Sequence, residues 1–442
     1  MIIIIIFKHI LLYIRMFRLL FNYTKLSLWC FIYYLKYHYY KNHDLFLLEI
    51  ILNNIQNTSS LGTKCIQKII PYLYLTDYDT DIIDLLKNTY ESNEKHEIEY
   101  TKKLYKSDFN KNIEDKYIIL DCVSSGSIGQ VYKIKDKLTD KIYALKVKHP
   151  NINYQLNIIK NFILLFNIHK QTIFDILGFI RNFELETDFN NEAKNMKLFY
   201  NYYIDVDNFI IPEIYEYTKN IILMEFIDGI RIDELNTYSR NKYISLFVLF
   251  SNNNKLILNF NHGDCHIGNF KKHSEDKIVI YDYGFCFELE DIKLGFIMDD
   301  FWSSLNNHEK YDNSFEECIY YMIRFNIQQE DIKFLEEDLE TDFFKDKMNG
   351  YFKDENDALV RFINLFKRHN LMFRIEYLNV LLIYYHTSNY IDCDQRDLYS
   401  ICKNFDILHE YQKILKDRVF YDSNIDALLD SDTINEFKNL II

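Results

Sequence analysis

The sequence predicts an α+β fold with two lobes, a helical extension before them and a mostly helical C-terminal lobe. Strand-like runs gather in one part of the chain, at 117–123, 131–135 and 141–147. The turn at 137–140 joins the last two runs as a hairpin. Helical patterns dominate on both sides of these strands, and the first that follows them covers 154–203.

Four segments follow from this pattern. A hydrophobic, basic segment covers 1–43, and a helical extension covers 44–115. The first lobe is expected at 116–230 and the second at 231–442. One short hairpin, at 269–282, interrupts the otherwise helical second lobe.

The bulk composition disfavours some classes of function. The 442 residues include 51 Lys and Arg against 65 Asp and Glu, which gives a net charge of −14. A nucleic-acid-binding protein would show a basic face, so we expect no nucleic-acid partner. The eight cysteines contain no CxxC pair, which is typical of the reduced thiols of an intracellular protein.

The charge of the N-terminal segment is uneven. Six Lys and Arg residues and no acidic residue precede Asp44, and they lie among apolar runs. A helix packed on the domain, a membrane-surface or membrane-spanning anchor and a mitochondrial targeting segment all stay open. The scarcity of Gly and Pro beside abundant Ile, Asn and Lys is typical of A/T-rich genomes, and a viral origin in a host cell is among the alternatives.

A run of small residues between two predicted strands is the first chemical signal. We call it the serine loop, and it consists of Ser124, Ser125, Gly126, Ser127, Ile128 and Gly129. Small side chains let backbone N–H groups come close to a phosphate chain. Lys146 lies between apolar neighbours in a later strand run, where a lysine can contact ATP phosphates. An ordinary Ser/Gly turn and a solvent-facing lysine would show the same patterns separately.

Lys146 needs a carboxylate partner to fix its position. Glu192, in the predicted helical stretch, is the candidate. Asp188 precedes it by four residues, so the two carboxylates are expected on the same helix face. A solvated acidic face is the alternative explanation of this spacing.

The strongest signal comes later in the chain. Asn269 follows the segment His262-Gly263-Asp264 by five residues, and Asp282 of Asp282-Tyr283-Gly284 follows thirteen residues further on. This is the spacing of a protein-kinase catalytic loop and metal-binding segment. We therefore expect Asn269 and Asp282 to hold Mg²⁺ and Asp264 to orient or deprotonate the attacking hydroxyl. Together with Lys146 and Glu192 as catalytic residues, these motifs predict a protein-kinase-like fold that binds ATP.

Two further segments have competing explanations. Residues 224–227 precede the catalytic loop at the distance of a hinge between two lobes, so the backbone of Glu225 and Ile227 is expected to bind adenine. An ordinary strand end is the alternative. The composition of His262, Cys265 and His266 would suit zinc, but no second ligand pair lies nearby in the sequence, which disfavours a zinc site.

These motifs resemble those of the UbiB family of atypical kinases, also called aarF-domain kinases. The catalytic loop of that family usually reads HGDPHPGN, and the sequence here reads HGDCHIGN. The resemblance rests on the loop segment 127–131, the strand-lysine segment 144–150, the ExD element at Glu186 and Asp188, the catalytic loop 262–269 and the KxGQ-like element at Lys64 and Gln67.

The resemblance implies that the helical extension lies over the active site, with Lys64, Gln67, Glu186 and Asp188 close to the nucleotide. It also implies an ATP-dependent activity linked to isoprenoid-quinone or other lipid metabolism, often at a membrane. Two departures from the family pattern stand out. Ile66 replaces the Gly of KxGQ, and the serine loop occupies a position that is alanine-rich in the family.

Three functions stay open at this point. The first is an ATPase or a kinase of lipids or other small molecules, of UbiB type. The second is a Ser/Thr protein kinase, which is disfavoured because no Ala-Pro-Glu segment follows Asp282. The third is a nucleotide-binding pseudokinase scaffold, and the intact set of motif residues argues against it.

Overall fold

The computed structural model describes residues 44–58, 95–165 and 175–289, together with single residues from 25 to 85 and from 361 to 383. Several predictions therefore fall wholly or largely outside the described residues. These are the predictions for the segment 1–43, for Gln67 and for the helical C-terminal part of the second lobe.

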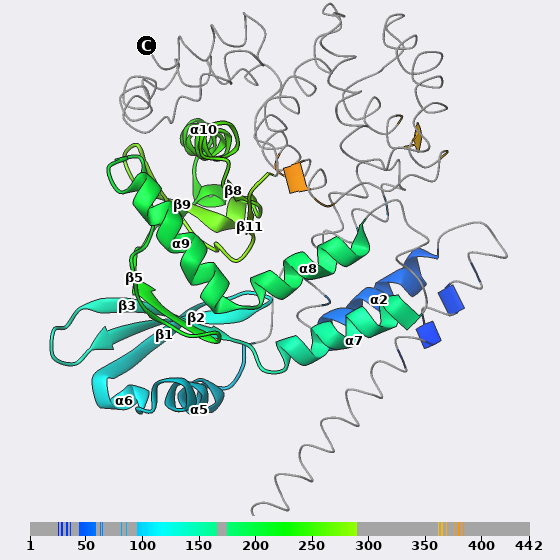
Figure 1. The fold of residues 1–442 in the computed structure, drawn as a ribbon, viewed down its shortest axis with the longest axis horizontal. Coiled ribbons are helices and arrows are strands. Elements are labelled where there is room, and N and C mark those ends of the chain that lie inside the picture. The colour runs from blue at the N-terminus through cyan, green and yellow to red at the C-terminus, as the bar shows by residue number, and fades with distance from the viewer. Residues whose placement is uncertain are drawn as a thin grey trace, which may run out of the picture.

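A five-stranded antiparallel sheet, the first sheet, occupies the middle of the described chain (Figure 1). Its strand order is β1-β2-β3-β6-β5. The strands are β1 (Tyr117–Ser125), β2 (Gly129–Asp136), β3 (Ile142–Lys148), β5 (Ile214–Tyr217) and β6 (Ile221–Glu225). The three runs predicted between 117 and 147 are therefore confirmed as strands.

The hairpin between β2 and β3 has a local chemical cause. Its turn begins at Asp136, whose carboxylate accepts hydrogen bonds from the N–H groups of Leu138 and Thr139 at 2.8 and 3.0 Å. Asp140 ends the turn with a φ of 57°, a left-handed conformation that Asp tolerates better than most residues. This geometry returns the chain so that Val131 pairs with Lys146.

Two helices of the predicted extension pack on one face of the first sheet. They are α5 (Ile98–Phe109) and α6 (Ile113–Lys116), and α2 (Leu45–Thr58) precedes them in the chain. Tyr105 and Ile113 are buried in one core with Leu145 and Leu223 of the sheet. This packing fixes α5 and α6 relative to the strands.

The helical stretch predicted at 154–203 is interrupted. Its described residues form three helices, α7 (Ile152–Leu165), α8 (Ile176–Glu186) and α9 (Phe189–Tyr203). Asp188 caps α9, because its carboxylate accepts a hydrogen bond from the Asn190 N–H at 3.0 Å and its own backbone is extended. Asp188 therefore lies before the helix that carries Glu192, and the prediction that both share a helix face is wrong.

The first residue of α9 packs on the other face of the first sheet. Phe189 is fully buried with Ile128 and Ile222. Figure 1 shows α9 on the side of this sheet opposite to α5 and α6. The sheet is thus covered on both faces, and α9 carries Glu192 toward the strand that holds Lys146.

A second, four-stranded sheet has the order β4-β10-β9-β7. Its strands are β4 (Phe209–Ile210), β7 (Ile230–Arg231), β9 (Phe270–Ser274) and β10 (Lys277–Ile280). β9 and β10 are the hairpin predicted at 269–282. A separate pair joins β8 (Asn261–His262) to β11 (Cys286–Phe287). The four strands of two residues each were not predicted, because two residues are too few to show the alternation of apolar and polar side chains that marks a strand.

Helix α10 (Thr237–Asn253) packs against the second sheet and continues as a π-helical segment, Asn254–Leu258. The contact is aromatic: the rings of Phe247 and Phe270 stack with centroids 4.0 Å apart. Contacts between aromatic rings add to the stabilisation that comes from burying their apolar area. The catalytic-loop residues come shortly after the π-helical segment, so the packing of α10 helps to fix where the loop begins.

None of the helices in the described ranges combines the length and the apolar character that crossing a bilayer requires.

Candidate active site

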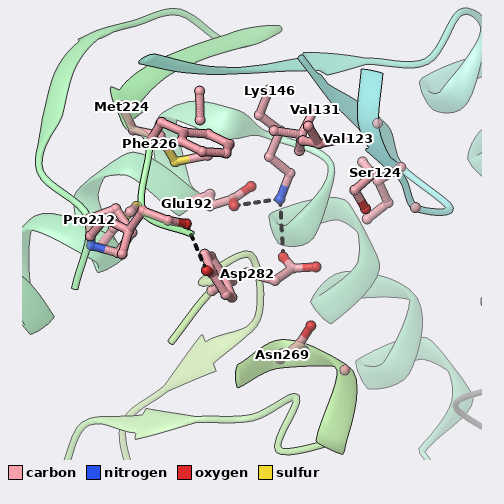
Figure 2. Close-up of a pocket in the computed structure, with 18 of the residues that line it drawn as sticks. Val123, Ser124, Val131, Lys146, Glu192, Pro212, Met224, Phe226, Asn269 and Asp282 are labelled. Atoms are coloured by element: carbon pink, nitrogen blue, oxygen red, sulfur yellow. Dashed lines mark hydrogen bonds and ion pairs between the residues drawn. The ribbon is translucent and has the colours of Figure 1, made fainter. Parts of the chain in front are cut away.

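A cavity of about 520 Å³ lies between the two sheets. Strand residues such as Val131 and Ala144 line it from the first sheet, and Asn269 and Asp282 line it from the second (Figure 2). This volume is in the range of small-molecule sites. The cavity therefore collects the motif residues that are far apart in the sequence.

Lys146 lies at the centre of the polar part of the cavity. Its ammonium is 2.5 Å from Glu192 Oε1 and 3.2 Å from Asp282 Oδ1. Figure 2 shows the lysine side chain reaching from β3 to both carboxylates. Glu192 is 3% exposed, so the carboxylate partner that we predicted from sequence lies where it can fix the lysine.

The charges of this group follow from burial and from each other. Burial opposes the charge on Lys146, but the carboxylates of Asp282 and Glu192 outweigh it and raise the pKa of the lysine. Burial would raise the pKa of Asp282, but Lys146 and Lys64 hold it below the usual range of an aspartate. Burial raises the pKa of Glu192 against the opposing effect of Lys146. Asp282 is thus an anion at neutral pH, as a ligand for a divalent cation must be.

The catalytic loop is held by backbone contacts of its histidine. The Nε2 of His262 is 3.1 Å from the Tyr281 carbonyl, and that oxygen can only accept, so Nε2 carries the proton. The Nδ1 then accepts a hydrogen bond from the Asp264 N–H at 3.3 Å. Burial lowers the pKa of His262, which keeps the ring neutral for both bonds. His262 therefore orients Asp264 and is bonded to the protein on both ring nitrogens.

Asn269 is turned by a bond to the same loop. Its amide Nδ2 donates to the Asp264 carbonyl at 2.8 Å, and its own carbonyl accepts from the Tyr281 N–H at 2.8 Å. Figure 2 shows the side chain of Asn269 below Asp282, with its oxygen directed toward that residue. An amide oxygen and a carboxylate are the hard donors that Mg²⁺ prefers, so the donor set fits this ion.

Asp282 has an unusual backbone. Its φ is 56°, a conformation that non-glycine residues seldom adopt and that often marks a functional position. The next residue fixes it, because Tyr283 is fully buried and its carbonyl accepts from Asn195 of α9 at 2.9 Å. The Tyr283 ring also lies 5.2 Å from the ring of His262. The segment that begins at Asp282 is thereby packed against both α9 and the loop that begins at His262.

Lys64 enters the site from the helical extension. Its ammonium is 2.9 Å from Glu186 Oε2 and 3.8 Å from Asp264 Oδ2. Burial opposes its charge, but Glu186, Asp282 and Asp264 outweigh burial and raise the pKa of Lys64. The resemblance implied that Lys64 lies near the nucleotide together with Glu186 and Asp188. The structure brings it to Glu186 and to Asp264, whereas Asp188 is exposed and caps α9.

The serine loop lines the cavity through Ser124, Gly126, Ser127, Ile128 and Gly129. The cavity lining within the described residues does not include Ser125. The loop is closed by a hydrogen bond from the Gly126 N–H to the Gly129 carbonyl at 2.9 Å. It is therefore a tight turn that borders the cavity.

The predicted hinge also lines the cavity, but the N–H group of Glu225 is bonded within the protein. The N–H of Glu225 donates to the Glu213 carbonyl at 2.7 Å inside the protein, so it is not free for adenine. The carbonyl of Ile227 accepts from the Tyr281 hydroxyl at 3.0 Å. This bond ties the hinge to the second sheet next to Asp282.

Several lining residues belong to no motif and were missed from sequence. They include Lys133, Asp228, Lys271 and Tyr281. The Lys133 ammonium lies 4.5 Å from the centre of the Phe226 ring. One signal was available, because Lys133 and Val131 are two residues apart in a strand and must face the same side. The others are placed by the second sheet, which the sequence did not show in full.

Residues 89–311 match the ABC1 atypical kinase-like domain. The matched region covers half of the chain, and with the site described above it defines the class of protein: a kinase-like fold. The chain belongs to the ABC1 family of atypical kinase-like proteins, and the resemblance to UbiB (aarF-domain) kinases is confirmed.

Individual relatives agree with this assignment. The chain is similar to an aarF domain-containing, chloroplastic protein kinase of Arabidopsis thaliana, with 27% identity over 37% of this chain and 24% of the relative. It is also similar to a probable serine/threonine-protein kinase, abkB, of Dictyostelium discoideum, with 31% identity over 47% of this chain and 34% of the relative. The matches thus span between a quarter and a third of these relatives.

Among solved structures, the chain is similar to a Mycobacterium tuberculosis protein determined in complex with erythromycin. The TM-score is 0.43 and the identity is 18%, over 58% of this chain and 67% of the other.

Proposed function

We propose that the protein is a Mg²⁺-dependent enzyme that transfers the γ-phosphoryl group of ATP to a small lipid or isoprenoid-type acceptor, or to water. The observation that supports it most directly is the contact of Lys146 with both Glu192 and Asp282 inside one cavity. A cation fixed between carboxylates beside hard oxygen donors provides the electrostatics that phosphoryl transfer needs.

Each residue has a role in this proposal. Lys146 contacts the phosphates, and Asn269 and Asp282 would hold Mg²⁺, which supplies neutralisation of phosphate charge when it is bound. The bond between the γ-phosphorus and the bridging oxygen breaks, and ADP leaves. A new bond forms between that phosphorus and the acceptor oxygen, whose proton passes to the carboxylate of Asp264.

The two-lobed arrangement belongs to the same proposal. The first sheet with α9 would be the first lobe, 116–230, and the second sheet with α10 the start of the second, 231–442. The extension 44–115 would cover the site through Lys64, and the segment 1–43 would bring the protein to a membrane surface. A membrane-associated protein inside the cell is the localisation that we propose.

The cover favours a small acceptor over a peptide. Lys64 is 8% exposed and lies 3.8 Å from Asp264, so its side chain occupies part of the approach to the residue that would receive the proton of the acceptor. An extended polypeptide needs an open surface there, whereas a single hydroxyl group or a water molecule needs little room. Protein phosphorylation is therefore the second candidate activity.

Turnover of Mg-ATP by the purified protein tests the proposal. We expect hydrolysis or transfer that rises with anionic liposomes or a lipid extract, and little label on a generic protein substrate. Asp264→Asn is the matched variant, because it should keep nucleotide binding while transfer slows. Binding of ATP without any turnover in the wild type would instead indicate a pseudokinase scaffold.

A Ser/Thr protein kinase is the second candidate, because one relative carries that description. Phosphate label on the protein substrate that exceeds lipid-dependent turnover would favour it over the first proposal.

A further inference from the structure

His149 lies outside the cavity and holds the serine loop. It follows β3 directly, and its backbone N–H donates to the Ile128 carbonyl at 2.8 Å. Its ring Nε2 is 2.9 Å from the Gly126 carbonyl. Gly126 and Ile128 line the cavity, whereas the described lining residues do not include His149. His149 therefore holds the serine loop by two hydrogen bonds, from the side that faces away from the cavity.

The partners assign the proton positions. The Gly126 carbonyl can only accept, so the Nε2 of His149 must donate. The Nδ1 of the neutral ring then accepts, and the Nδ1 of His96, 2.7 Å away, is the donor. The Nε2 of His96 accepts in turn from the Thr101 hydroxyl at 2.8 Å. The hydroxyls of Thr101 and Tyr132, 2.9 Å apart, complete the set. We call these four residues the histidine relay.

The relay is rigid and neutral. Burial lowers the pKa of His96 to about 4, and the neighbouring His149 adds to this. Burial likewise lowers the pKa of His149, against the effect of its bond to Gly126. The amide of Gln130 fixes the backbone of His96, since it accepts from the N–H at 2.9 Å and donates to the carbonyl at 3.1 Å. Thr101 is fully buried and Gln130 is 1% exposed.

The orientation of one peptide group follows from these contacts. In a trans peptide the C=O and the N–H point in opposite directions, and no described peptide bond is cis. The carbonyl of Gly126 is directed at His149, so the N–H of Ser127 in the same peptide group points the other way. Gly126 and Ser127 both line the cavity, and backbone N–H groups facing a cavity are the donors that phosphate-binding loops use.

We propose that the histidine relay is a positioning device: His149 and His96 hold the Gly126 carbonyl away from the cavity and so present the Ser127 N–H to the phosphates of a bound nucleotide. This inference rests on the proposed ATP-binding function. His149 and His96 would thus be positioning residues, because neither of them lines the cavity.

The ratio of two affinities tests the inference. Binding of Mg-ATP and of adenosine is measured by calorimetry for the wild type, His149→Phe and His96→Phe. Loss of one oriented hydrogen bond to phosphate should weaken ATP binding roughly tenfold. Adenosine has no phosphate, so its affinity should stay within about twofold.

Three further variants sharpen the test. In His149→Gln the side-chain amide can still donate to Gly126, so most of the ATP affinity should return. Leu104→Ala is the stability control, because Leu104 lies on α5 with Thr101 and packs against the core of the first sheet without belonging to the relay. Thr101→Val breaks the relay at its far end and replaces the histidine variants if they do not fold.

The outcomes separate the two proposals. A wild type that binds neither ligand would overturn the proposed function itself. If the wild type binds ATP but the ratio of ATP to adenosine affinity is unchanged in His149→Phe, His96→Phe and Thr101→Val, the relay has no positioning role. A fall of that ratio in Leu104→Ala as large as in His149→Phe would also overturn the inference.

Discussion

Lys146 forms ion pairs with two carboxylates in the cavity, those of Glu192 and Asp282. We predict that Lys146→Ala and Asp282→Asn each reduce Mg-ATP turnover by about a hundredfold or more, because each removes electrostatic stabilisation of the transferring phosphoryl group. Lys160→Ala is the matched control, since Lys160 pairs with Glu184 at 2.7 Å in a half-exposed position away from the cavity. Near-normal turnover in either site variant would contradict the role given to that residue.

Lys64 supports a second prediction at the residue scale. Removing one partner of a buried ion pair is costly, about 3–5 kcal/mol in well-buried cases. Lys64→Ala should therefore lower the melting temperature, and it should change ATP affinity or unmask autophosphorylation because Asp264 loses its cover. Thermal unfolding, ATP titration and radiolabel transfer measure these effects. Indistinguishable ATP affinity and autophosphorylation in wild type and variant would argue against a covering role.

At the scale of the element, the turn between β1 and β2 distinguishes its two glycines. A Cβ at Gly129 would lie 2.6 Å from the Val147 carbonyl and 3.1 Å from the Phe189 ring, whereas one at Gly126 would meet nothing closer than 3.6 Å. We predict that Gly129→Ala destabilises the fold by about 1–3 kcal/mol, while Gly126→Ala is tolerated. Denaturant unfolding of the two variants measures this. Equal stabilities would show that the turn adjusts more readily than the structure indicates.

The burial of His96, just before α5, predicts that the free energy of unfolding depends on pH. The pKa of His96 is lowered from 6.5 to about 4 in the folded state, so the unfolded chain binds a proton first as pH falls. The stabilisation is fully present above pH 6.5 and is lost as pH falls toward 4, at up to about 1.4 kcal/mol per pH unit. Urea unfolding between pH 4.5 and 7.5 should show a steeper dependence for wild type than for His96→Phe. His273→Phe, at an exposed histidine, should keep the wild-type slope, and a shared slope for all three proteins would contradict the assignment.

At the scale of the whole molecule, the basic segment before Asp44 carries a prediction about membranes. Each well-placed Lys or Arg contributes roughly 1 kcal/mol to binding an anionic surface. A chain shortened to remove residues up to Lys41 should stay folded and lose co-sedimentation with anionic liposomes at low salt. Zwitterionic liposomes provide the control. Equal co-sedimentation of the full and shortened chains would rule out this role.

The sequence predicted the parts of the molecule that follow from local patterns of residues. Alternating strands, a turn and fixed motif spacings were enough to place Lys146, Glu192, Asn269 and Asp282 in one cavity. It could not predict contacts that depend on the path of the chain between distant segments. The KxGQ-like element implied that Lys64 lies near the nucleotide, but its contact with Asp264 spans 200 residues in sequence, and no local pattern identifies that partner. The capping role of Asp188 was missed for a different reason, because an acidic residue suits a helix face and a helix start equally well.

The bond between the Tyr281 hydroxyl and the Ile227 carbonyl has a consequence for communication across the site. Tyr281 is the immediate neighbour of Asp282, so under the proposed function the adenine end and the metal end of the cavity would be joined through one side chain. A displacement of the hinge by bound adenine would then shift the carboxylate that holds the ion. By thermodynamic reciprocity, whatever purine recognition does to the affinity for a divalent ion, the ion does equally to purine recognition.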